Sequence, residues 1–507
     1  MRAACYRLNN VQCSPLFLNS AAFSSAAKKT TSTESQGVEP GYLGYLSNAV
    51  SSVISAWSGS IATTSQKKVD LVEKRPRIIL KTSRNAVTNV SRAIVEKILL
   101  AETTESRLLR IRELVKHIQD YPPTRLSVAQ EPRLISLLLK LESSSSSEEP
   151  LRCDARLCLS MCGYVRPSSA RGINLLCIDG GGTRGMMGLE VLEAIEEAAG
   201  GKKIHELFDH IVGVSTGGII AVMLGMKKMS VSDCRKTYMD ISKKLFSQSR
   251  ISGATGLILN HSYYDTKKWI GMLKEIPKEK GVPNVCIISS IVNLPILQPY
   301  VFRNYEHPAG HDSHYRGGTH HPIWQAVQAS AAAPGYFEEV VIESESGTIL
   351  HQDGGVIANN PTAIGIHETK TLRPMEALNC LVSVGNGRSV HELEPAPLFS
   401  ATKAHHKLLK IIDSATDTEA VHLAMHFTLD DNVYYRLNPY MSQTYGLDEI
   451  DPKSLDQMVT DAKLYVRRNT AKIEAAAERL CIQPSITQKA LRLLNDVKDR
   501  SGFYSPQ

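Results

Sequence analysis

The sequence of 507 residues predicts an α/β fold with a mostly parallel central sheet and helices on both of its faces. Two segments show the underlying pattern. An apolar run at 173–178 enters a helix-like stretch through a glycine-rich turn, and a second run at 211–214 does the same. Strands that pass into helices in this way are typical of parallel sheets, whose functional groups gather at the carboxyl ends of the strands.

The first of these turns, residues 180–185, reads Gly-Gly-Gly-Thr-Arg-Gly. Glycines there let backbone N–H groups converge on an anion, and the following helix adds the positive end of its dipole. Gly180, Gly182 and Gly185 also satisfy G-x-G-x-x-G, the fingerprint of dinucleotide-binding folds. The turn therefore predicts an anion site, and the nature of the anion is open at this point.

The second turn, residues 213–217, reads Gly-Val-Ser-Thr-Gly between a strand-like run and a helix-like run. This context is typical of a nucleophile elbow. Gly213 and Gly217 permit a sharp turn that presents the hydroxyl of Ser215 at the start of the helix. A simple structural turn is the alternative interpretation.

A third motif, Asp353-Gly354-Gly355, follows an apolar stretch. By itself, Asp-Gly is a strong signal for a hairpin turn. After the other two motifs it predicts an aspartate in an open loop, flanked by Gly354 and Gly355, where it could act as a general base.

Together the three motifs predict acyl transfer. The hydroxyl of Ser215 is a weak nucleophile, so a base must take its proton during attack on a carbonyl carbon, and Asp353 is the candidate. The N–H groups of the loop would hold the resulting oxyanion, with positive charge from an arginine beside it. The predicted oxyanion residues are Gly180, Gly181, Gly182, Arg184 and Gly185.

At these residues the chain resembles the patatin-like phospholipases. The segments 302–305, 329–337 and 351–355 are similar to the calcium-independent phospholipase A2-gamma branch in particular. The resemblance extends over roughly residues 170–440. It implies a three-layer α/β/α fold, a Ser215–Asp353 dyad and an acyl-enzyme intermediate. It also implies calcium-independent hydrolysis of membrane glycerophospholipids to free fatty acid and lysophospholipid.

Other functions are compatible with parts of the pattern. A nucleotide-binding protein would use the glycine loop for a phosphate, with Glu206 or Asp209 as a ribose-binding acid. An acyltransferase or a neutral-lipid lipase of the same fold would use the same dyad. The nucleotide interpretation leaves Ser215 and Asp353 unexplained, so we prefer the phospholipase.

The resemblance implies a dyad, whereas an α/β-hydrolase triad would add a histidine after the aspartate. The candidates for that histidine are His367, His391, His405 and His406, all of which follow Asp353 in the chain. His351, two residues before Asp353, would share its face of a strand and contribute at most weakly to its pKa.

Histidines also gather in ways that could suggest a metal site, within 307–321 and as the pair His422 and His426. Neither set has the glutamate of a His-Glu-x-x-His motif or a recognisable third ligand. The cysteines within 153–162 match none of the usual paired zinc spacings. We therefore expect no metal and no cofactor, and the ten scattered cysteines fit a reducing compartment.

The composition of the amino-terminal part of the sequence indicates where in the cell the protein is located. Residues 1–33 contain four basic residues, many serines and alanines, and no acidic residue. This composition predicts a mitochondrial transit peptide over 1–39, with a disordered tail as the alternative. The four positive charges account for most of the formal net charge of +7. We therefore expect no nucleic acid partner.

Residues 40–66 carry no charge, and their apolar side chains recur at steps of three and four, with Trp57 among them. A basic cluster follows within 67–77. Over 40–86 the pattern predicts an amphipathic segment at an anionic membrane surface, and a helix packed on the protein itself is the alternative.

The rest of the chain divides by composition and periodicity. A helical module is expected over 87–142, a linker region over 143–170, the catalytic domain over 171–385, and a helix-rich extension packed on it over 386–507. Within that extension, 455–480 reads as one long helix.

Together these features predict a membrane-associated intracellular protein that is located in mitochondria. The last residues, Ser-Pro-Gln, do not match the Ser-Lys-Leu peroxisomal signal. The oligomeric state is left open by the sequence.

Overall fold

The computed structural model describes residues 84–144, 147–165, 171–247, 282–308, 310–334, 336–344, 347–389 and 418–503. By its contacts the chain forms two units, Met1–Leu80 and Lys81–Gln507, and all described residues belong to the second. The predicted transit segment and nearly all of the predicted membrane-interface segment lie outside the described residues. Among the helices in the described ranges, none combines the length and apolar character needed to cross a bilayer.

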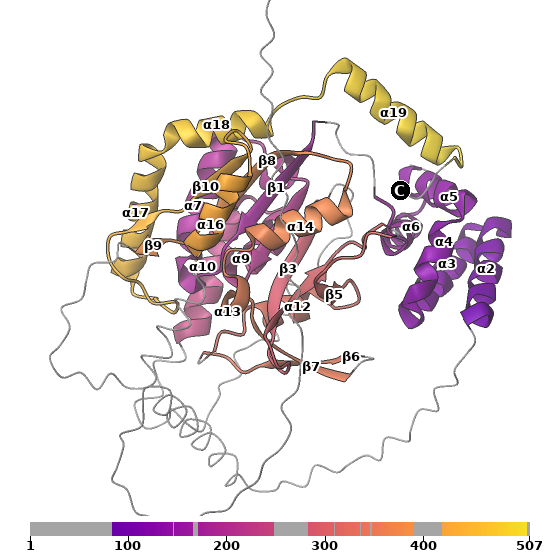
Figure 1. The fold of residues 1–507 in the computed structure, drawn as a ribbon, viewed down its shortest axis with the longest axis horizontal. Coiled ribbons are helices and arrows are strands. Elements are labelled where there is room, and N and C mark those ends of the chain that lie inside the picture. Colours follow the sequence, from indigo (N-terminus) through magenta and orange to yellow (C-terminus); the bar gives the residue numbers. More distant parts are fainter. Residues whose placement is uncertain are drawn as a thin grey trace, which may run out of the picture. The chain divides into compact units, whose positions relative to one another are not determined.

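The described residues contain one central sheet of nine strands, in which five neighbours run parallel in the order β10-β8-β1-β2-β3 (Figure 1). These strands are β1 (Ile173–Ile178), β2 (His210–Val214), β3 (Asn284–Ile291), β8 (Leu378–Val384) and β10 (Tyr434–Leu437). All six residues of β1 and all five of β2 are buried, as expected for parallel strands that helices cover on both faces.

Antiparallel strands complete the sheet beyond β3. They are β4 (Gln298–Arg303), β5 (Arg316–Gly318), β6 (Val340–Ser344) and β7 (Gly347–Asp353). Both β4 and β7 pair antiparallel with β3, while β5 pairs parallel with β4 and β6 pairs antiparallel with β7. A separate two-stranded sheet joins β9 (Arg388–Ser389) to β11 (Tyr440–Met441).

Side chains of β1 alternate between two cores, one on each face of the sheet. Leu176 and Ile178 belong to the larger core, and Leu175 and Cys177 belong to the smaller one. Helices that pack against the larger core are α7 (Gly185–Ala198), α9 (Thr216–Ala221), α10 (Val231–Ser247), α12 (Ile323–Ser330), α17 (Pro452–Arg468) and α18 (Thr470–Leu480). The other face is covered by α14 (Thr362–Leu372) and α16 (Thr418–Thr428). The predicted three-layer α/β/α fold with a mostly parallel sheet is confirmed.

Short elements connect these layers. They are η2 (Gly182–Arg184), α8 (Ile204–Leu207), the π-helical turn η3 (Val222–Met226) and α13 (Gly355–Ala358).

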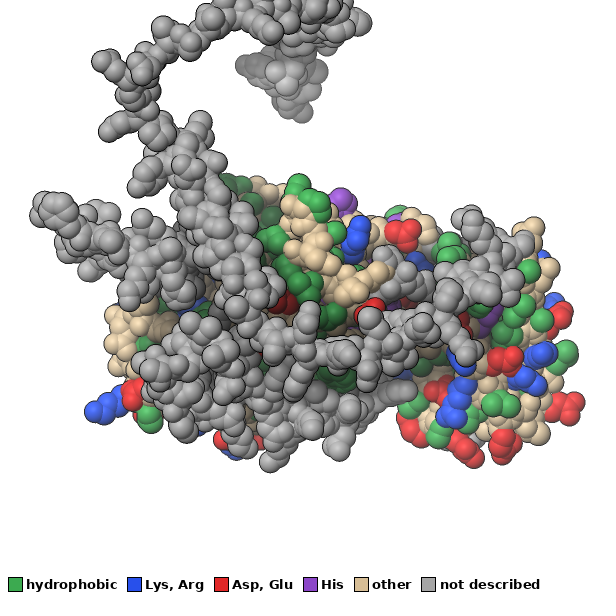
Figure 2. Space-filling model, turned by 90° about the horizontal axis from the view of Figure 1, so that it is seen from below, with side chains coloured by type: hydrophobic (Ala, Val, Ile, Leu, Met, Phe, Trp, Pro, Cys, Tyr) green, Lys and Arg blue, Asp and Glu red, His purple; other side chains and the backbone are tan. Residues whose placement is uncertain are grey.

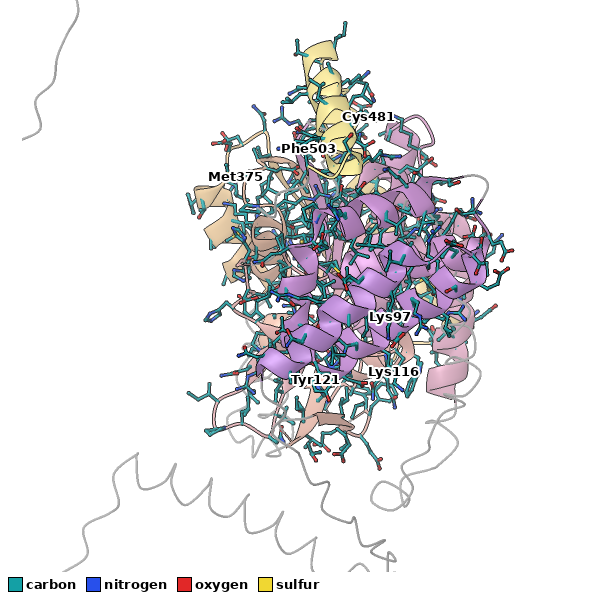
Figure 3. The ribbon with its side chains drawn as sticks, turned by 90° about the vertical axis from the view of Figure 1, so that its right-hand side faces the viewer. Lys97, Lys116, Tyr121, Met375, Cys481 and Phe503 are labelled. Atoms are coloured by element: carbon teal, nitrogen blue, oxygen red, sulfur yellow. The ribbon has the colours of Figure 1, made fainter. Side chains whose placement is uncertain are left out.

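A helical module precedes the sheet and has its own apolar core. It consists of α2 (Arg84–Leu100), α3 (Thr104–Asp120), η1 (Pro122–Thr124), α4 (Arg125–Ala129), α5 (Pro132–Ser143) and α6 (Glu149–Met161). Figure 3 faces this module, with Lys97, Lys116 and Tyr121 labelled on its helices.

The module extends further than the sequence predicted. Residues 149–161 fall in the range expected to be a linker, but they form α6, which packs on α3 and α5. Its apolar residues Leu151, Ala155 and Cys158, spaced by three and four, are buried in the module core. The serine run at 143–147 has the composition of a linker, and the predicted linker was extended from it to residue 170. The helical periodicity of residues 149–161 was therefore missed.

The carboxyl-terminal segment also differs from the prediction in two respects. It supplies β10, an edge strand of the central sheet, so the fold does not end at residue 385. The single helix expected over 455–480 is two helices, α17 and α18, which both pack on α7. The chain turns between them at Asn469, whose side-chain N–H donates to the Tyr465 carbonyl at 2.8 Å and so terminates α17.

The helical module contacts the sheet at the amino ends of its parallel strands. Arg125 donates to the carbonyl of His307 at 2.9 Å and Ser160 to that of Asn304 at 3.3 Å, just beyond β4. The last helix, α19 (Ile486–Arg500), lies beside α5, and Tyr164 donates to Asp499 at 3.0 Å. The module is thus attached at the edge opposite the carboxyl ends of the parallel strands.

Candidate active site

Ser215 follows the last residue of β2 and has a backbone conformation that non-glycine residues rarely adopt, with φ 53° and ψ −122°. Among the described residues, Lys228 is the other non-glycine residue with positive φ. The Ser215 amide donates to Oγ of Ser330 at 2.8 Å, and Ser330 donates in turn to the Ile288 carbonyl at 2.6 Å. Strain of this kind persists where surrounding contacts hold it, and it is typical of functional sites.

The two glycines of the elbow are required by close backbone approaches. A Cβ atom at Gly217 would lie 2.2 Å from the carbonyl oxygen of Ile178, and one at Gly213 would lie 2.2 Å from the Gly217 carbonyl oxygen. Neither backbone can move away without disturbing β1 or the elbow. The predicted role of Gly213 and Gly217 in permitting the turn therefore has a direct steric basis.

The register of the sheet brings Asp353 to Ser215. Val214, at the end of β2, pairs with Ile288 of β3. Asp353, at the end of the antiparallel strand β7, pairs with the next β3 residue, Ser289. Because β4 occupies the opposite edge of β3 at these positions, β2 and β7 share one edge and meet end to end. The predicted nucleophile and the predicted base thus stand at the ends of strands that run toward each other.

Ser215 and Asp353 form a direct hydrogen bond, in which Oγ of the serine donates to Oδ2 of the aspartate at 2.5 Å. The other carboxylate oxygen, Oδ1, accepts from the Gly355 amide at 2.7 Å. Asp353 is 6% exposed, and burial raises its pKa to about 6 against the opposing effect of these two hydrogen bonds. At neutral pH the carboxylate is ionised and is placed to accept the serine proton.

Glycines next to Asp353 are also set by close contacts. A Cβ atom at Gly354 would lie 2.2 Å from the carbonyl oxygen of Ile288, and one at Gly355 would lie 3.0 Å from Oδ1 of Asp353. The Asp-Gly-Gly motif is a strand-to-helix junction between β7 and α13, not the hairpin turn that the dipeptide alone suggests.

The raised pKa of Asp353 predicts a pH-dependent cost to stability. A carboxyl whose folded pKa exceeds its unfolded value stabilises the fold below about pH 4, and this contribution is lost as pH rises through about 6. At pH 7.5 the replacement Asp353→Asn should therefore raise the melting temperature, by an amount equivalent to about 2–3 kcal/mol, and at pH 4.5 the gain should be smaller. Thermal melts at both pH values measure the change in melting temperature, with the replacement of the exposed Asp431 by asparagine as control. Equal increases at the two pH values would contradict a raised pKa for Asp353.

The glycine loop supplies two free N–H donors next to Ser215. A Cβ atom at Gly180 would lie 3.3 Å from Cβ of Ser215, so the loop and the nucleophile are adjacent. Within the part of the chain that the structure describes, the amides of Gly181 and Gly182 donate to no acceptor. The amide of Gly180 donates to the Asn359 carbonyl at 3.2 Å. The prediction that Gly180 contributes its N–H to the oxyanion hole therefore needs correction.

Arg184 acts on the loop through a backbone carbonyl. Its amide and its Nε both donate to the Gly181 carbonyl oxygen, at 3.1 and 3.3 Å. A peptide group is planar and trans, so fixing the Gly181 carbonyl also fixes the direction of the Gly182 N–H. Arg184 thus has a positioning role in addition to the positive charge that the sequence suggested.

The peptide group between Gly182 and Thr183 is also held by hydrogen bonds. The Gly182 carbonyl accepts hydrogen bonds from Oγ1 of Thr216 at 3.0 Å and from the hydroxyl of Tyr238. Gly182 has φ +54°, and a Cβ atom there would lie 2.1 Å from the carbonyl oxygen of Leu447. A Cβ atom at Gly185 would lie 2.3 Å from Cγ2 of Thr216. Glycine is therefore required at 182 and 185 by packing within the site.

The structure adds functional residues that the sequence reasoning did not single out. They are Asp179, Tyr238, Ser330, Asn359, Asn386 and Arg436, all of which bond to the elbow or to the glycine loop or its flanks. A signal existed for both Asp179 and Arg436, because Asp179 directly follows the buried strand β1 and Arg436 lies within the buried strand β10.

The two candidate histidines that the structure describes, His351 and His367, do not join the dyad. His351 is fully buried and hydrogen-bonded to Ser289 at 2.9 Å, and burial lowers its pKa to about 4. It is therefore neutral and is absent from the groups that shift the pKa of Asp353. His367 lies on α14, and its ring accepts a hydrogen bond from the amide of His314 at 3.0 Å. The predicted positions 391, 405 and 406 lie outside the described residues.

Within the described ranges, no three His, Cys, Asp or Glu side chains are grouped to hold a metal ion. His422 hydrogen-bonds to the Tyr434 hydroxyl at 3.1 Å, and its ring centroid is 6.0 Å from that of His426. The two rings therefore serve packing and a structural hydrogen bond.

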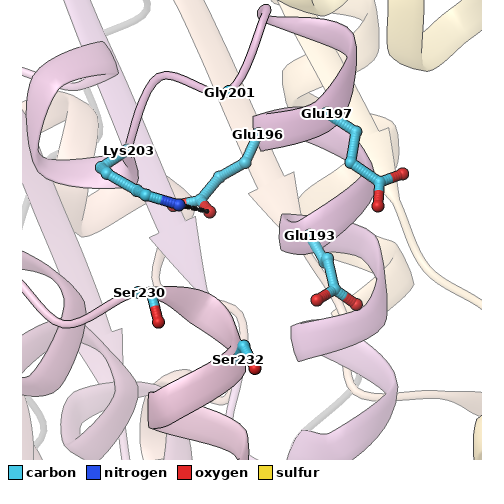
Figure 4. Close-up of a pocket in the computed structure, with 7 residues that line it drawn as sticks. All are labelled: Glu193, Glu196, Glu197, Gly201, Lys203, Ser230 and Ser232. Carbon is cyan, nitrogen blue, oxygen red and sulfur yellow. Dashed lines mark hydrogen bonds and ion pairs between the residues drawn. The ribbon is translucent and has the colours of Figure 1, made fainter.

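An acidic pocket of about 200 Å³ opens at the carboxyl end of α7 (Figure 4). Three glutamates of α7 line it, and Lys203 pairs with one of them, Glu196, at 3.1 Å. Because α7 begins at the glycine loop and rises about 1.5 Å per residue, this end lies well away from Ser215. The pocket is not part of the dyad site.

Comparison with known proteins shows which proteins the chain is similar to. Residues 176–366 match the family model described as patatin-like phospholipase. The chain is 37% identical over 455 residues to calcium-independent phospholipase A2-gamma of Homo sapiens, covering 87% of this chain and 56% of that protein. The Mus musculus protein of the same name is 36% identical over 450 residues, covering 85% and 57%.

Two further matches are more distant. Phospholipase A I of Arabidopsis thaliana is 28% identical over 421 residues, covering 71% of this chain and 31% of that protein. The crystal structure of VipD from Legionella pneumophila matches 59% of this chain and 67% of that one, with 13% identity and a TM-score of 0.28. The chain spans a little over half the length of the phospholipase A2-gamma relatives it matches. The chain therefore contains a patatin domain, the domain described as patatin-like phospholipase, over residues 176–366.

Proposed function

We propose that this protein is a calcium-independent serine acyl hydrolase, which releases free fatty acid and lysophospholipid from membrane glycerophospholipids. The observation that carries the proposal is the 2.5 Å hydrogen bond from Ser215 to Asp353, beside a loop in which two amides have no acceptor among the described residues. The names of two relatives, calcium-independent phospholipase A2-gamma and phospholipase A I, support the substrate class.

The reaction follows from the positions of these groups. Asp353 takes the proton from Oγ of Ser215 as that oxygen attacks the ester carbonyl carbon. The amides of Gly181 and Gly182 stabilise the negative charge on the former carbonyl oxygen. As the intermediate collapses, the glycerol oxygen leaves with the proton from Asp353, which yields lysophospholipid and an acyl-serine. Water, activated by the same aspartate, then releases the fatty acid.

The approach of a lipid surface is supported by apolar side chains near the dyad. Ile296, in the loop between β3 and β4, is 77% exposed, and Val341 of β6 is 56% exposed. The loop follows β3, and both β3 and β6 pair with β7, the strand that ends at Asp353. Figure 2 views the molecule from below Figure 1, and hydrophobic side chains surface near the middle of that face.

The nucleotide-binding alternative is not favoured, because its two acidic candidates lie elsewhere. Asp209 accepts a hydrogen bond from the Asn174 amide at 2.9 Å, at the beginning of β1, whereas the glycine loop follows the end of β1. A strand of six residues spans about 20 Å, which separates the two. Glu206 accepts from the Lys203 amide as part of the α8 cap. Acyl transfer to an acceptor other than water remains compatible with the same dyad.

The proposed location is mitochondrial and membrane-associated. It is supported by the basic, acid-free composition of residues 1–33 and by the uncharged periodic stretch 40–66 with the basic cluster after it. An anionic membrane surface is accordingly the proposed partner. These segments lie outside the described residues, so the proposal rests on composition.

The full chain should hydrolyse a phosphatidylcholine that carries two different acyl chains, and a calcium chelator should leave the rate unchanged. The reason is that the catalytic groups are a serine, an aspartate and backbone amides, none of which needs a metal. Mass spectrometry of the fatty acid and lysophospholipid measures the rate and the ester position attacked. Absence of fatty acid release, or a rate that chelation abolishes and calcium restores, would refute the proposal. Acyl products formed on an added alcohol would instead identify an acyltransferase.

A further inference from the structure

A buried ion pair lies directly behind the glycine loop. Asp179, the residue before Gly180, receives two hydrogen bonds from the guanidinium of Arg436, one to each carboxylate oxygen, at 2.9 and 2.6 Å. The side chains are 2% and 3% exposed for Arg436 and Asp179. A bidentate ion pair of this kind fixes the orientation of the carboxylate as well as its distance from the guanidinium.

The backbone of Asp179 is restrained at the same time. Its amide donates to the Val384 carbonyl at 3.0 Å, and its carbonyl accepts from Nδ2 of Asn386 at 2.6 Å. The side chain, the amide and the carbonyl of the residue that begins the loop are thus all held. Because the free amides of Gly181 and Gly182 follow within three residues, their positions depend on this anchor.

Arg436 reaches Asp179 from the edge strand of the sheet. It belongs to β10, which is separated from β1 by β8 (Figure 1). The Arg436 guanidinium crosses β8 and also donates a hydrogen bond to Oγ of Ser383 on that strand, at 2.9 Å. Glu419 of α16 lies 3.6 Å from the same guanidinium. The arginine therefore ties three adjacent strands together at their carboxyl ends.

A second contact from the same segment holds the loop. The Thr183 amide donates to the Leu447 carbonyl at 2.8 Å. Arg436 and Leu447 both lie beyond residue 366, where the match to the family model ends, and beyond residue 385, where the sequence predicted the catalytic domain to end. The segment that follows the recognised domain thus bonds to the loop on both sides of the free amides.

Stability alone is a poor explanation for the ion pair. Burying two charges costs several kcal/mol per ion, and apolar pairs of similar volume are often equally stable or more stable. A fixed geometry is what an ion pair supplies and an apolar pair does not.

We propose that Arg436 is a positioning residue for the oxyanion hole, and that the segment 434–447 completes the active site. Arg436 acts through Asp179 on the direction of the Gly181 and Gly182 amides. This inference rests on the proposed hydrolase function. A misplacement of about 1 Å at a catalytic group can cost about a hundredfold in rate.

The test uses the full chain and the variants Arg436→Met, Arg436→Lys and the double variant Asp179→Leu with Arg436→Met. The double variant removes both charges, so it avoids an unpaired buried carboxylate and preserves the fold. Arg303→Met is the matched control, because Arg303 forms a similar buried pair with Glu368, with 5% and 0% exposure, at the opposite edge of the sheet. Melting temperature, kcat and KM are measured for each variant with a soluble ester and with its thiono analogue, in which sulfur replaces the carbonyl oxygen.

A positioning role has a specific signature. The double variant should keep a melting temperature near that of the wild type, while its kcat on the oxygen ester falls about tenfold to a hundredfold at nearly constant KM. Its preference for the oxygen ester over the thionoester should also shrink, because the larger sulfur anion gains less from an ordered oxyanion hole. Arg436→Lys should recover part of kcat. Arg303→Met should lower the melting temperature and leave the ester preference unchanged.

Two failures are distinguishable. A folded double variant with wild-type kcat and an unchanged ester preference would overturn the positioning role of Arg436 while leaving the hydrolase proposal intact. Equal losses on both esters would also overturn it, since they would indicate a purely structural role. A wild-type chain that cleaves neither ester would refute the hydrolase proposal itself.

Discussion

Replacing Ser215 with alanine is expected to abolish phospholipid hydrolysis, with a loss of kcat on the order of 10⁶-fold. The hydroxyl is the group that Asp353 contacts at 2.5 Å, and its removal leaves the oxyanion hole with no nucleophile to assist. The fold should tolerate the change, because the Ser330 contact that holds the elbow uses the backbone amide of Ser215, which alanine retains. Fatty acid release from the full chain measures the effect.

The matched control is Ser232→Ala, which removes an exposed serine hydroxyl from α10. It should leave the rate at the wild-type level. If Ser215→Ala kept a tenth or more of the wild-type kcat while folded, Ser215 could not be the nucleophile.

Replacing Asp353 with asparagine is the second large effect that we expect. Asparagine is close in shape but cannot accept the serine proton, so kcat should fall by about 10²–10⁴-fold. KM should change little, because the carboxylate acts on the serine and does not hold the lipid.

The pH dependence of the wild type provides an independent check on the same residue. With the Asp353 pKa at about 6, kcat/KM should fall as pH drops below about 6, since the protonated acid cannot act as a base. The sign is therefore an increase of activity with pH across this range. The residual activity of Asp353→Asn should lack this acid limb, whereas Asp431→Asn should retain it. An acid limb that survives in Asp353→Asn would assign the titration to another group.

The dyad could be predicted from the sequence because each half is a local pattern. Ser215 stands in a strand–turn–helix context that a few adjacent residues define, and Asp353 ends an apolar strand before two glycines. Their meeting could not be derived from spacing alone. It depends on β7 pairing antiparallel with β3 at the position where β2 ends, which is a property of the assembled sheet.

The occupation of the Gly180 amide and the anchor at Asp179 depend on residues that are distant in the chain. Asp179 and Arg436 are separated by 257 positions, and no local periodicity connects them. The sequence did contain one relevant signal, a charged residue at the centre of the apolar strand β10. A buried charge needs a partner, so Arg436 could have been identified as half of a pair, but its partner could not have been named.

Errors in the helical regions have local physical causes. The serine run before α6 has low helix propensity, and it led to a linker being predicted where Leu151 and Cys158 are in fact buried in the module core. The junction at Asn469 interrupts an otherwise continuous periodic pattern, because the asparagine side chain competes for a helix carbonyl. In both places the local sequence obscured where a helix begins or ends.

The central claim, that a single Ser215–Asp353 dyad hydrolyses the lipid ester, is tested most directly by titrating the full chain with a fluorophosphonate while fatty acid release is followed. The reagent reacts with an activated serine and places a phosphonyl oxygen in the oxyanion hole. We predict that hydrolysis declines in proportion to one adduct per chain, and that peptide mass spectrometry finds this adduct on Ser215. Full modification of Ser215 with hydrolysis intact, or inactivation by an adduct on another residue, would contradict the claim.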